Sequence, residues 1–392
     1  MCGLRHLTLT VLVIAAAGAA GEAPKASEAQ KAREGPLDDA HRTRAGELID
    51  GGVKFLLAAR ESDGGWSLGQ GAMKPAITAM VLKALIAHRD YSLDSPVVHK
   101  GYQVLLGYQR KDGGFYEPRM GLSNYTTSIA IMALVAAGPQ RFKSVIDKAG
   151  KFLRGSQIRS GATTPRGRKV VRGHKFEGGV SYGKHGRPDL SNQGMWMEAM
   201  AEAGVAPDDP DMQRAIAFVL RLQNRSESNP AAFVAQGPND GGFVYAYGES
   251  KAGAGPGGRG LRSYGTMTYV GFKSMLHAGL TPDDPRVKAA YKWIRRYWRL
   301  DANPNMPGLK SKQGLFYYYH VFARALRLWG RPVVVDLKGR SHNWRHELID
   351  ALAARSARDG SWRNEDSPRW NEGSPVLVTC YAVLALQETL KK

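Results

Sequence analysis

A short motif, consisting of an acidic residue, two glycines and an apolar residue, recurs along the chain and constrains its fold more than any other feature. Clear copies begin at Asp63, Asp112, Glu177 and Asp240, and weaker copies begin at Gln313 and Asp359. The first glycines, at positions 64, 113, 178, 241, 314 and 360, lie 49, 65, 63, 73 and 46 residues apart. Repetition on this scale is typical of proteins that are built from one supersecondary unit, so we expect six such units.

Each copy of the motif lies between two stretches of helical periodicity that differ in kind. The stretches before the motif are amphipathic; in the fifth, Val287, Tyr291 and Ile294 form an apolar stripe opposite a basic face. The stretches after the motif are apolar almost all round, as at residues 77–86, 129–137, 266–276 and 376–386. A helix without a polar face has to be covered on every side. The sequence therefore predicts six helix pairs, twelve helices in all, in two concentric rings with the amphipathic helices outside.

The motif itself has a mechanical interpretation. A glycine just after an outer helix can adopt the left-handed conformation that ends a helix. The aromatic residue that follows can pack against a neighbouring pair, and the acidic side chain can accept hydrogen bonds from loop amides. Because the copies stay in phase with the helical stretches, we expect the motif to link the two helices of every pair.

Residues Gln109-Arg110-Lys111-Asp112-Gly113-Gly114-Phe115 resemble the Gln-x-x-Asp-Gly-Gly-aromatic repeat of the squalene–hopene cyclases. A looser form of this repeat occurs in the β subunits of protein prenyltransferases, so the chain is similar to the prenyltransferase and squalene oxidase repeat family. The resemblance covers about residues 40 to 390. It implies an all-α fold, the α6/α6 toroid, as a single domain over residues 41–392 around a central cavity. Toroids of this kind host unrelated functions, so the fold alone implies no activity.

The chemistry of the class II terpene cyclases does not carry over to this chain. These enzymes protonate an alkene with the aspartate of an Asp-x-Asp-Asp motif and stabilise the resulting cations with aromatic faces. No Asp-x-Asp-Asp occurs here; residues 208–211 read Asp-Asp-Pro-Asp. They precede a predicted outer helix, where acidic side chains cap the backbone amides.

The resemblance to the prenyltransferases extends to one further position. Tyr319-His320 corresponds to a Tyr-His pair whose histidine binds catalytic zinc in that family. The partner Asp-x-Cys ligands should lie near residues 263–267, which read Ser-Tyr-Gly-Thr-Met. A lone histidine does not make a zinc site. His342 and His346 are four residues apart, but no third ligand is evident, and we expect a solvated helix face. We therefore predict no metal and no other cofactor.

The candidate site residues are those that the toroid would bring to one mouth of the ring. His320 and Tyr264 are the candidate catalytic residues, and His320 is expected to titrate near neutrality because an imidazole commonly does. The candidate ligand-pocket residues, mostly aromatic with one acid among them, are Tyr125, Tyr182, Trp196, Tyr317, Tyr319, Trp370, Glu372 and Tyr381. The competing interpretation is that these side chains only pack between helices.

Charge and cysteine content narrow the range of partners. Lysine and arginine number 55 against 35 acidic residues, which gives a net charge of +20. A basic rim formed by residues 166–175, Arg259 and Arg262 would attract an anionic polymer. No nucleic-acid recognition module is visible, so we expect a small-molecule or anionic polymer ligand and no nucleic acid. The two cysteines, Cys2 and Cys380, exclude a disulfide framework.

The N-terminal residues predict export. Residues 1–20 combine a basic start, a short apolar run and small residues at the end, which is typical of a secretory signal peptide. Residues 21–40 are rich in Ala, Glu, Lys and Pro and are expected to form a disordered leader. No later stretch approaches the length of a transmembrane helix. We therefore expect an exported protein, periplasmic or extracellular, that is a monomer without a membrane span in its mature chain.

Three classes of function remain open. The first is a toroid scaffold that binds a ligand or partner at its mouth. The second is a terpenoid cyclase-like enzyme with an altered acid, which would have a deep aromatic cavity with one buried carboxylate. The third is a lyase or hydrolase that acts on an anionic glycan, which would have an open groove with arginine, tyrosine and histidine at its floor.

Overall fold

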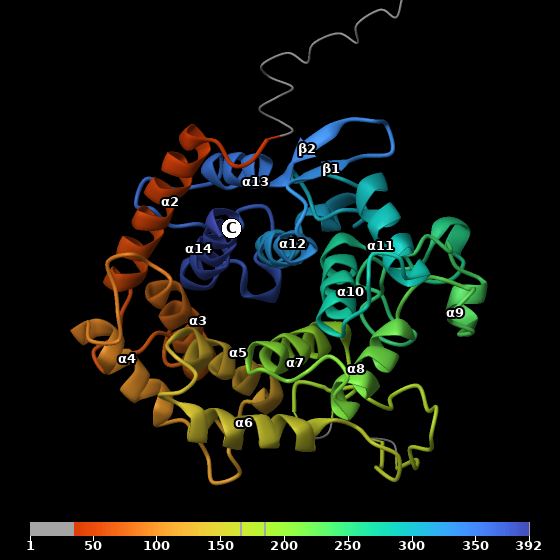
Figure 1. Ribbon diagram of the computed structural model, residues 1–392, viewed down its shortest axis with the longest axis horizontal. Helices are drawn as coiled ribbons and strands as arrows, with labels where there is room; N and C mark the ends of the chain where they lie inside the picture. Colours follow the sequence, from red (N-terminus) through yellow and green to blue (C-terminus); the bar gives the residue numbers. More distant parts are fainter. Residues whose placement is uncertain (1–34, 165–166, 184–185, 392) are drawn as a thin grey trace, which may run out of the picture.

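Twelve long helices form two concentric rings in the computed structural model, which describes residues 35–164, 167–183 and 186–391 (Figure 1). The outer ring consists of α2 (Asp39–Ala58), α4 (Pro96–Leu106), α6 (Lys143–Ser156), α8 (Pro210–Leu220), α11 (Pro285–Arg296) and α13 (Trp344–Ala353). The inner ring consists of α3 (Lys74–Ile86), α5 (Ser123–Ala136), α7 (Leu190–Glu202), α10 (Gly265–His277), α12 (Leu315–Trp329) and α14 (Pro375–Leu390). The predicted α6/α6 toroid is confirmed.

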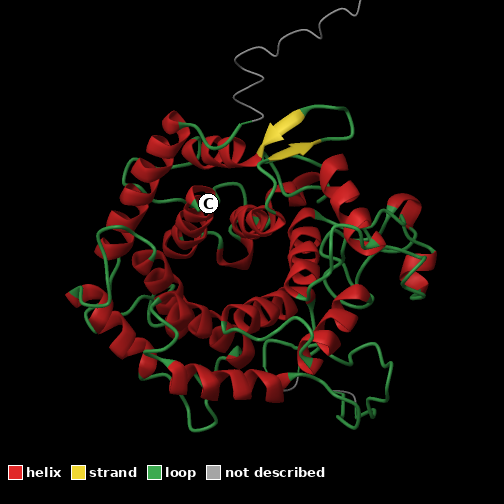
Figure 2. Ribbon diagram, viewed as in Figure 1, coloured by secondary structure: helices red, strands yellow, loops and turns green. Residues whose placement is uncertain are grey.

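The remaining elements are short and lie in the connections (Figure 2). They are α9 (Ala232–Ala235), the 3-10 turns η1 (Pro256–Gly258), η2 (Gly308–Lys312) and η3 (Arg369–Asn371), and the strands β1 (Val333–Val335) and β2 (Ser341–Asn343). The two strands form one antiparallel hairpin between α12 and α13. Of these, η3 positions residues of the candidate site.

Burial separates the two rings as the apolar patterns predict. In α11 only one stripe is buried, formed by Val287, Ala290, Trp293 and Ile294. In α3 every residue from Pro75 to Leu82 is buried, because an outer helix covers one side and inner neighbours cover the others. The inner helices therefore form the core, and their first turns lie together at one end of the ring.

The first glycine of the motif touches the outer helix of the next pair. Gly113 has φ +91°, and a Cβ built on it would lie 2.4 Å from the carbonyl oxygen of Lys148 in α6. The left-handed conformation that the sequence predicts is therefore present. The prediction that this glycine ends the preceding helix is wrong, because α4 ends at Leu106. Glycine is required here for close contact between neighbouring pairs.

The other motif residues make the same bonds in successive pairs. Asp112 accepts a hydrogen bond from the amide of Gly114 at 3.1 Å, as predicted for the acidic position. The amide of Phe115 donates to the hydroxyl of Thr127 in α5 at 2.9 Å. Equivalent amide-to-hydroxyl bonds join Trp66 to Thr78, Phe243 to Thr268 and Trp362 to Thr379. These four motifs thus tie their loops to the first turns of the inner helices that follow.

The last pair closes the ring onto the first. A Cβ built on Gly360, with φ +82°, would lie 2.4 Å from the carbonyl oxygen of Gly51 in α2. Helix α14 packs against both α12 and α2. The contact at the seam is therefore the same as those made by Gly113, Gly178 and Gly241.

The predicted signal peptide, residues 1–20, lies outside the described residues, as does most of the predicted leader, residues 21–40. The described part begins at Gly35, and α2 begins at Asp39. Among the described residues, none of the helices combines the length and the apolar character needed to cross a membrane.

Candidate functional site

A cavity of about 290 Å³ lies where the first turns of all six inner helices meet. Apolar side chains in the lining include Met73, Ile77 and Met80, from α3 and the residue before it, and Leu377 from α14. The aromatic side chains come from several loops and first turns. The tyrosines in the lining are Tyr125, Tyr182, Tyr245, Tyr264, Tyr317 and Tyr381.

Seven of the sequence-predicted site residues lie together in this lining. They are the candidate catalytic residue Tyr264 and the candidate pocket residues Tyr125, Tyr182, Tyr317, Trp370, Glu372 and Tyr381. The rings of Tyr317 and Tyr381 are 5.5 Å apart, and those of Tyr125 and Tyr182 are 5.9 Å apart. Such spacing is that of rings in contact.

Two predicted pocket residues point away from the cavity. Trp196 is fully buried and donates from its indole nitrogen to the carbonyl oxygen of Leu153 in α6, 2.9 Å away. Tyr319 donates from its hydroxyl to the carbonyl oxygen of Leu300, in the connection after α11. Both side chains therefore pack between the rings, as the competing interpretation holds.

His320 lies deeper in the ring than the cavity. It lines a small separate void of about 20 Å³, together with Glu198 and Arg324, and Met80 lines both spaces. Burial and the positive charge of Arg324 lower the pKa of His320 to about 3. The expectation that His320 titrates near neutrality is therefore wrong, and its imidazole is neutral at physiological pH.

Two further lining residues, Tyr245 and Lys251, are not among the sequence-predicted site residues. Tyr245 follows Phe243 by two residues, as Tyr182 follows Val180, so its place relative to the motif could have identified it. The ammonium of Lys251 lies 4.2 Å from the ring centre of Tyr245 and 2.5 Å from Glu249. Lys251 thus places a positive charge beside the aromatic wall.

Glu372 is the carboxyl group of the cavity wall. It lies just after η3 and accepts hydrogen bonds from the amide of Tyr317, 2.8 Å away, and from Asn364, 2.6 Å away. Burial raises the pKa of Glu372 to about 7 in spite of these hydrogen bonds. The group therefore changes between its acid and its carboxylate form near neutral pH.

The turn that carries Glu372 adopts an unusual backbone. Trp370 has φ +57° and Asn371 has φ +65°, a region that residues other than glycine rarely adopt. The indole of Trp370 lies over Gly314, where a Cβ would approach it to 3.0 Å, and the side chain is 41% exposed. The strained turn places Trp370 and Glu372 side by side in the wall of the cavity.

A second buried carboxyl group, Asp189, lies close to Tyr182 and Tyr245. It caps α7 and accepts from the amide and the side chain of Asn192, at 3.0 and 2.8 Å. Burial raises the pKa of Asp189 to about 6, although these hydrogen bonds and one with Tyr245 oppose the rise. Asp189 is thus coupled to the cavity through Tyr245.

Beyond His320, buried ion pairs fill the centre of the ring. Glu198 of α7 pairs with Lys273 of α10 and with Arg324 of α12, and all three side chains are almost fully buried. Arg324 also pairs with Glu388 of α14, 2.9 Å away. We call Glu198, Lys273, Arg324 and Glu388 the central ion cluster. It connects four inner helices across the ring, so the cavity occupies one end only.

No protein-family model and no curated protein sequence matches the chain. Solved structures do. One is a variant of the type II terpene cyclase MstE from Scytonema in complex with its substrate, geranylgeranyl dihydroxybenzoate. It has a TM-score of 0.55 and 15% sequence identity, covering 90% of this chain and 99% of that one. A protein from Actinoplanes has a TM-score of 0.52 and 16% identity, covering 88% and 100%.

A glycosidase aligns less closely, with a TM-score of 0.46 and 12% identity over 90% of this chain and 99% of that one. The likeness to MstE and to the Actinoplanes protein shows a shared toroid fold. It does not carry an activity from one protein to another. The chemistry has to be argued from the cavity of this chain.

Proposed function

We propose that the protein binds a small, mainly apolar ligand of the prenyl or terpenoid class in the cavity at the mouth of the ring. The observation that carries this proposal is the lining, which combines six tyrosines and Trp370 with methionine, isoleucine and leucine side chains. Enclosed apolar surfaces with few polar groups favour ligands of this kind. The complex of MstE with geranylgeranyl dihydroxybenzoate supports the ligand class by analogy of fold.

The buried carboxyl groups near the cavity favour binding of the ligand without protonation of an alkene. Protonation of an alkene requires a strongly acidic donor, and the pKa values of Glu372, about 7, and Asp189, about 6, make both groups weak acids. Protonated Glu372 is better suited to donate a hydrogen bond to an oxygen of the ligand. With the predicted signal peptide, the protein would be an exported scaffold or carrier for such a ligand.

Fluorescence titration with geranylgeraniol tests the proposal, because Trp370 and six tyrosines report from the lining. We expect saturable quenching and a rise in the melting temperature for the wild type. Trp370→Ala should weaken binding about tenfold or more, since an aromatic anchor is lost. Leu337→Ala, which removes an exposed apolar side chain at the distant hairpin, serves as the control. The absence of saturable binding to the wild type would exclude the proposal.

A terpenoid cyclase-like enzyme with an altered acid is the second candidate, and Glu372 is the observation that favours it. This carboxyl group is buried in the wall of an aromatic cavity, and in its acid form it could protonate an oxygen of a substrate. Turnover of an epoxidised prenyl substrate that is lost in Glu372→Gln, with binding retained, would establish this function.

The cavity gives less support to a lyase or hydrolase of anionic glycans. Its lining, taken over the residues that the structure describes, contains neither arginine nor histidine, which that chemistry was expected to use. An acidic oligosaccharide such as trigalacturonate is therefore the comparison ligand in the titration. Binding of trigalacturonate in place of geranylgeraniol would reverse the order of the candidates.

A further inference from the structure

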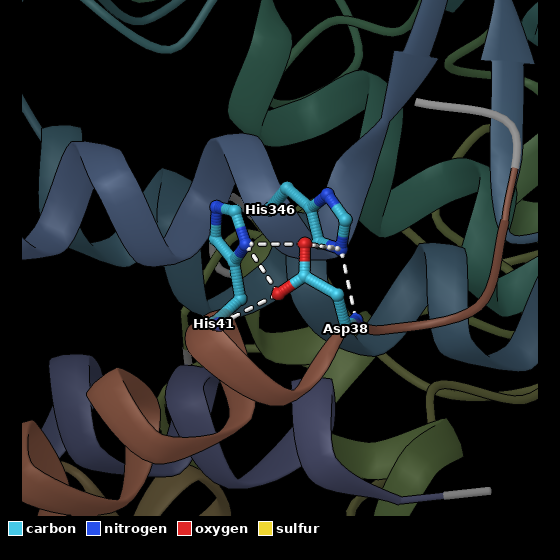
Figure 3. A group of neighbouring side chains, drawn as sticks. All are labelled: Asp38, His41 and His346. Atoms are coloured by element: carbon cyan, nitrogen blue, oxygen red, sulfur yellow. Dashed lines mark hydrogen bonds and ion pairs between the residues drawn. The ribbon is translucent and has the colours of Figure 1, made fainter. Parts of the chain in front are cut away.

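Three side chains with metal-ligating atoms meet at the seam of the ring, away from the cavity (Figure 3). Asp38 and His41 lie at the start of α2, the first outer helix, and His346 lies in the first turn of α13, the last outer helix. One nitrogen of each histidine and one oxygen of Asp38 lie within 4.8 Å of one another. The cluster thus joins residues about 300 positions apart.

Both imidazoles present a nitrogen to the same carboxylate. Nδ1 of His41 lies 2.8 Å from Oδ1 of Asp38, and Nε2 of His346 lies 3.6 Å from Oδ2. The rings are parallel, with centroids 4.0 Å apart and an interplanar angle of 5°, so the two nitrogens lie on the same side of the stack. Two imidazole nitrogens and a carboxylate oxygen form a ligand set that suits zinc and similar divalent metals.

The opposite nitrogen of His41 has a second carboxylate behind it. Nε2 of His41 lies 3.5 Å from Asp350 of α13, and Asp350 is in turn held by Arg44 at 3.1 Å. A carboxylate behind an imidazole fixes the ring and leaves the other nitrogen free to bind a metal. His41 has this arrangement, with Nδ1 facing Asp38 and His346.

The contacts that now occupy Nε2 of His346 are weak enough for a metal ion to replace them. Nε2 of His346 accepts from the amide of Asp38 at 3.3 Å and lies 3.4 Å from the amide nitrogen of Asn343, and both contacts are long for hydrogen bonds. The side chains of Asp38 and His41 are 39% and 24% exposed, so an ion and its water ligands have access.

We propose that Asp38, His41 and His346 bind one divalent transition metal ion of the zinc, cobalt or nickel type, with water completing the coordination. Such an ion would be bonded to both α2 and α13 and would hold the first and last outer helices together. The expectation that His346 lies on a solvated face is wrong, since its side chain is buried. His342 turns elsewhere, with Nδ1 2.7 Å from Glu347, so it is not part of the set.

Calorimetric titration of the untagged, chelator-treated full chain with Zn²⁺, and absorption spectroscopy with Co²⁺, test the site. We expect one ion per chain, visible cobalt bands and a melting temperature that rises with zinc. His346→Gln and His41→Ala should each lower zinc affinity at least about tenfold, and Asp350→Asn roughly 10- to 100-fold through loss of the supporting carboxylate. Asp38→Asn keeps a cap for α2 and should also lose affinity.

The matched control is His99→Ala, which removes an exposed histidine from an early turn of another outer helix, where it contacts Gln103. His99→Ala should leave the stoichiometry and affinity for zinc unchanged. Circular dichroism at each step shows whether a variant is folded. The proposal is overturned if the wild type binds no zinc, or if folded His41→Ala and His346→Gln bind it as tightly as the wild type.

Discussion

At the scale of single residues, Glu372 makes the stability of the protein depend on pH. Its pKa rises from 4.5 to about 7 on folding because burial penalises the carboxylate. The folded state therefore holds a proton that the unfolded state releases between these values, and stability falls as pH rises through this window. Above pH 7 the loss is complete.

Glu372→Gln should remove this dependence, because the amide cannot ionise. The difference in the free energy of unfolding, variant minus wild type, should increase by up to roughly 3 kcal/mol from pH 5 to pH 8. Urea unfolding at the two pH values measures the difference. Glu365→Gln, at an exposed residue nearby that pairs with Arg363, is the control and should show no such gain. Equal differences at both pH values would mean that folding does not raise the pKa of Glu372.

At the scale of elements, the glycine motif allows close contact between neighbouring helix pairs. Gly113→Ala would place a methyl group 2.4 Å from a carbonyl oxygen of α6 at a positive φ. We expect a loss of more than about 2 kcal/mol, seen as a lower melting temperature. Gly150→Ala, within α6, meets nothing within 4 Å and should stabilise the helix by up to about 1 kcal/mol. Similar effects of the two substitutions would contradict the assigned role of the motif.

The helices were predictable from the sequence because their apolar patterns are long and the motif repeats in phase with them. The direction of a side chain within an inner helix was not. In α12, Tyr317 faces the cavity while Tyr319 faces the outer layer and His320 lies one turn deeper. A helix that is apolar all round has no polar face to indicate which side is inward, so periodicity cannot separate these positions.

Contacts between segments that are distant in the sequence could not be predicted either. Tyr245 and Lys251 reach the cavity from the connection between α8 and α10, and Asp38 meets His346 across the seam. Only Tyr245 had a signal in the sequence, its position relative to the motif. The position of Lys251 depends on the path of a long loop, and the contact of Asp38 with His346 depends on how the ring closes. No local sequence pattern contains either.

At the scale of the whole molecule, the central ion cluster connects four helices of the inner ring. Burial opposes ionisation of Glu388, but the charges of Arg324, Lys391 and Arg327 outweigh it and lower its pKa from 4.5 to about 2. Stability from this group is therefore present above pH 4.5 and is lost as the pH falls towards 2. The cluster should make the ring sensitive to acid.

Arg324→Met should destabilise the protein by about 3–5 kcal/mol, because Glu198 and Glu388 would keep buried charges without this partner. The control Lys391→Met removes a half-exposed partner of Glu388 and should cost less than about 1 kcal/mol. Denaturant unfolding at pH 7 measures both. If Arg324→Met lowered the free energy of unfolding no more than Lys391→Met, Arg324 would not be needed to balance the buried charges of Glu198 and Glu388.

The position of that cluster also limits what can pass through the molecule. Charged side chains occupy the middle of the ring, so the cavity is closed at its inner end. A ligand would therefore enter and leave through the mouth of the ring. A long polymer cannot thread through the hole. Only a compact molecule, or the free end of a chain, could occupy the cavity. The uptake and the release of such a ligand would share a single route.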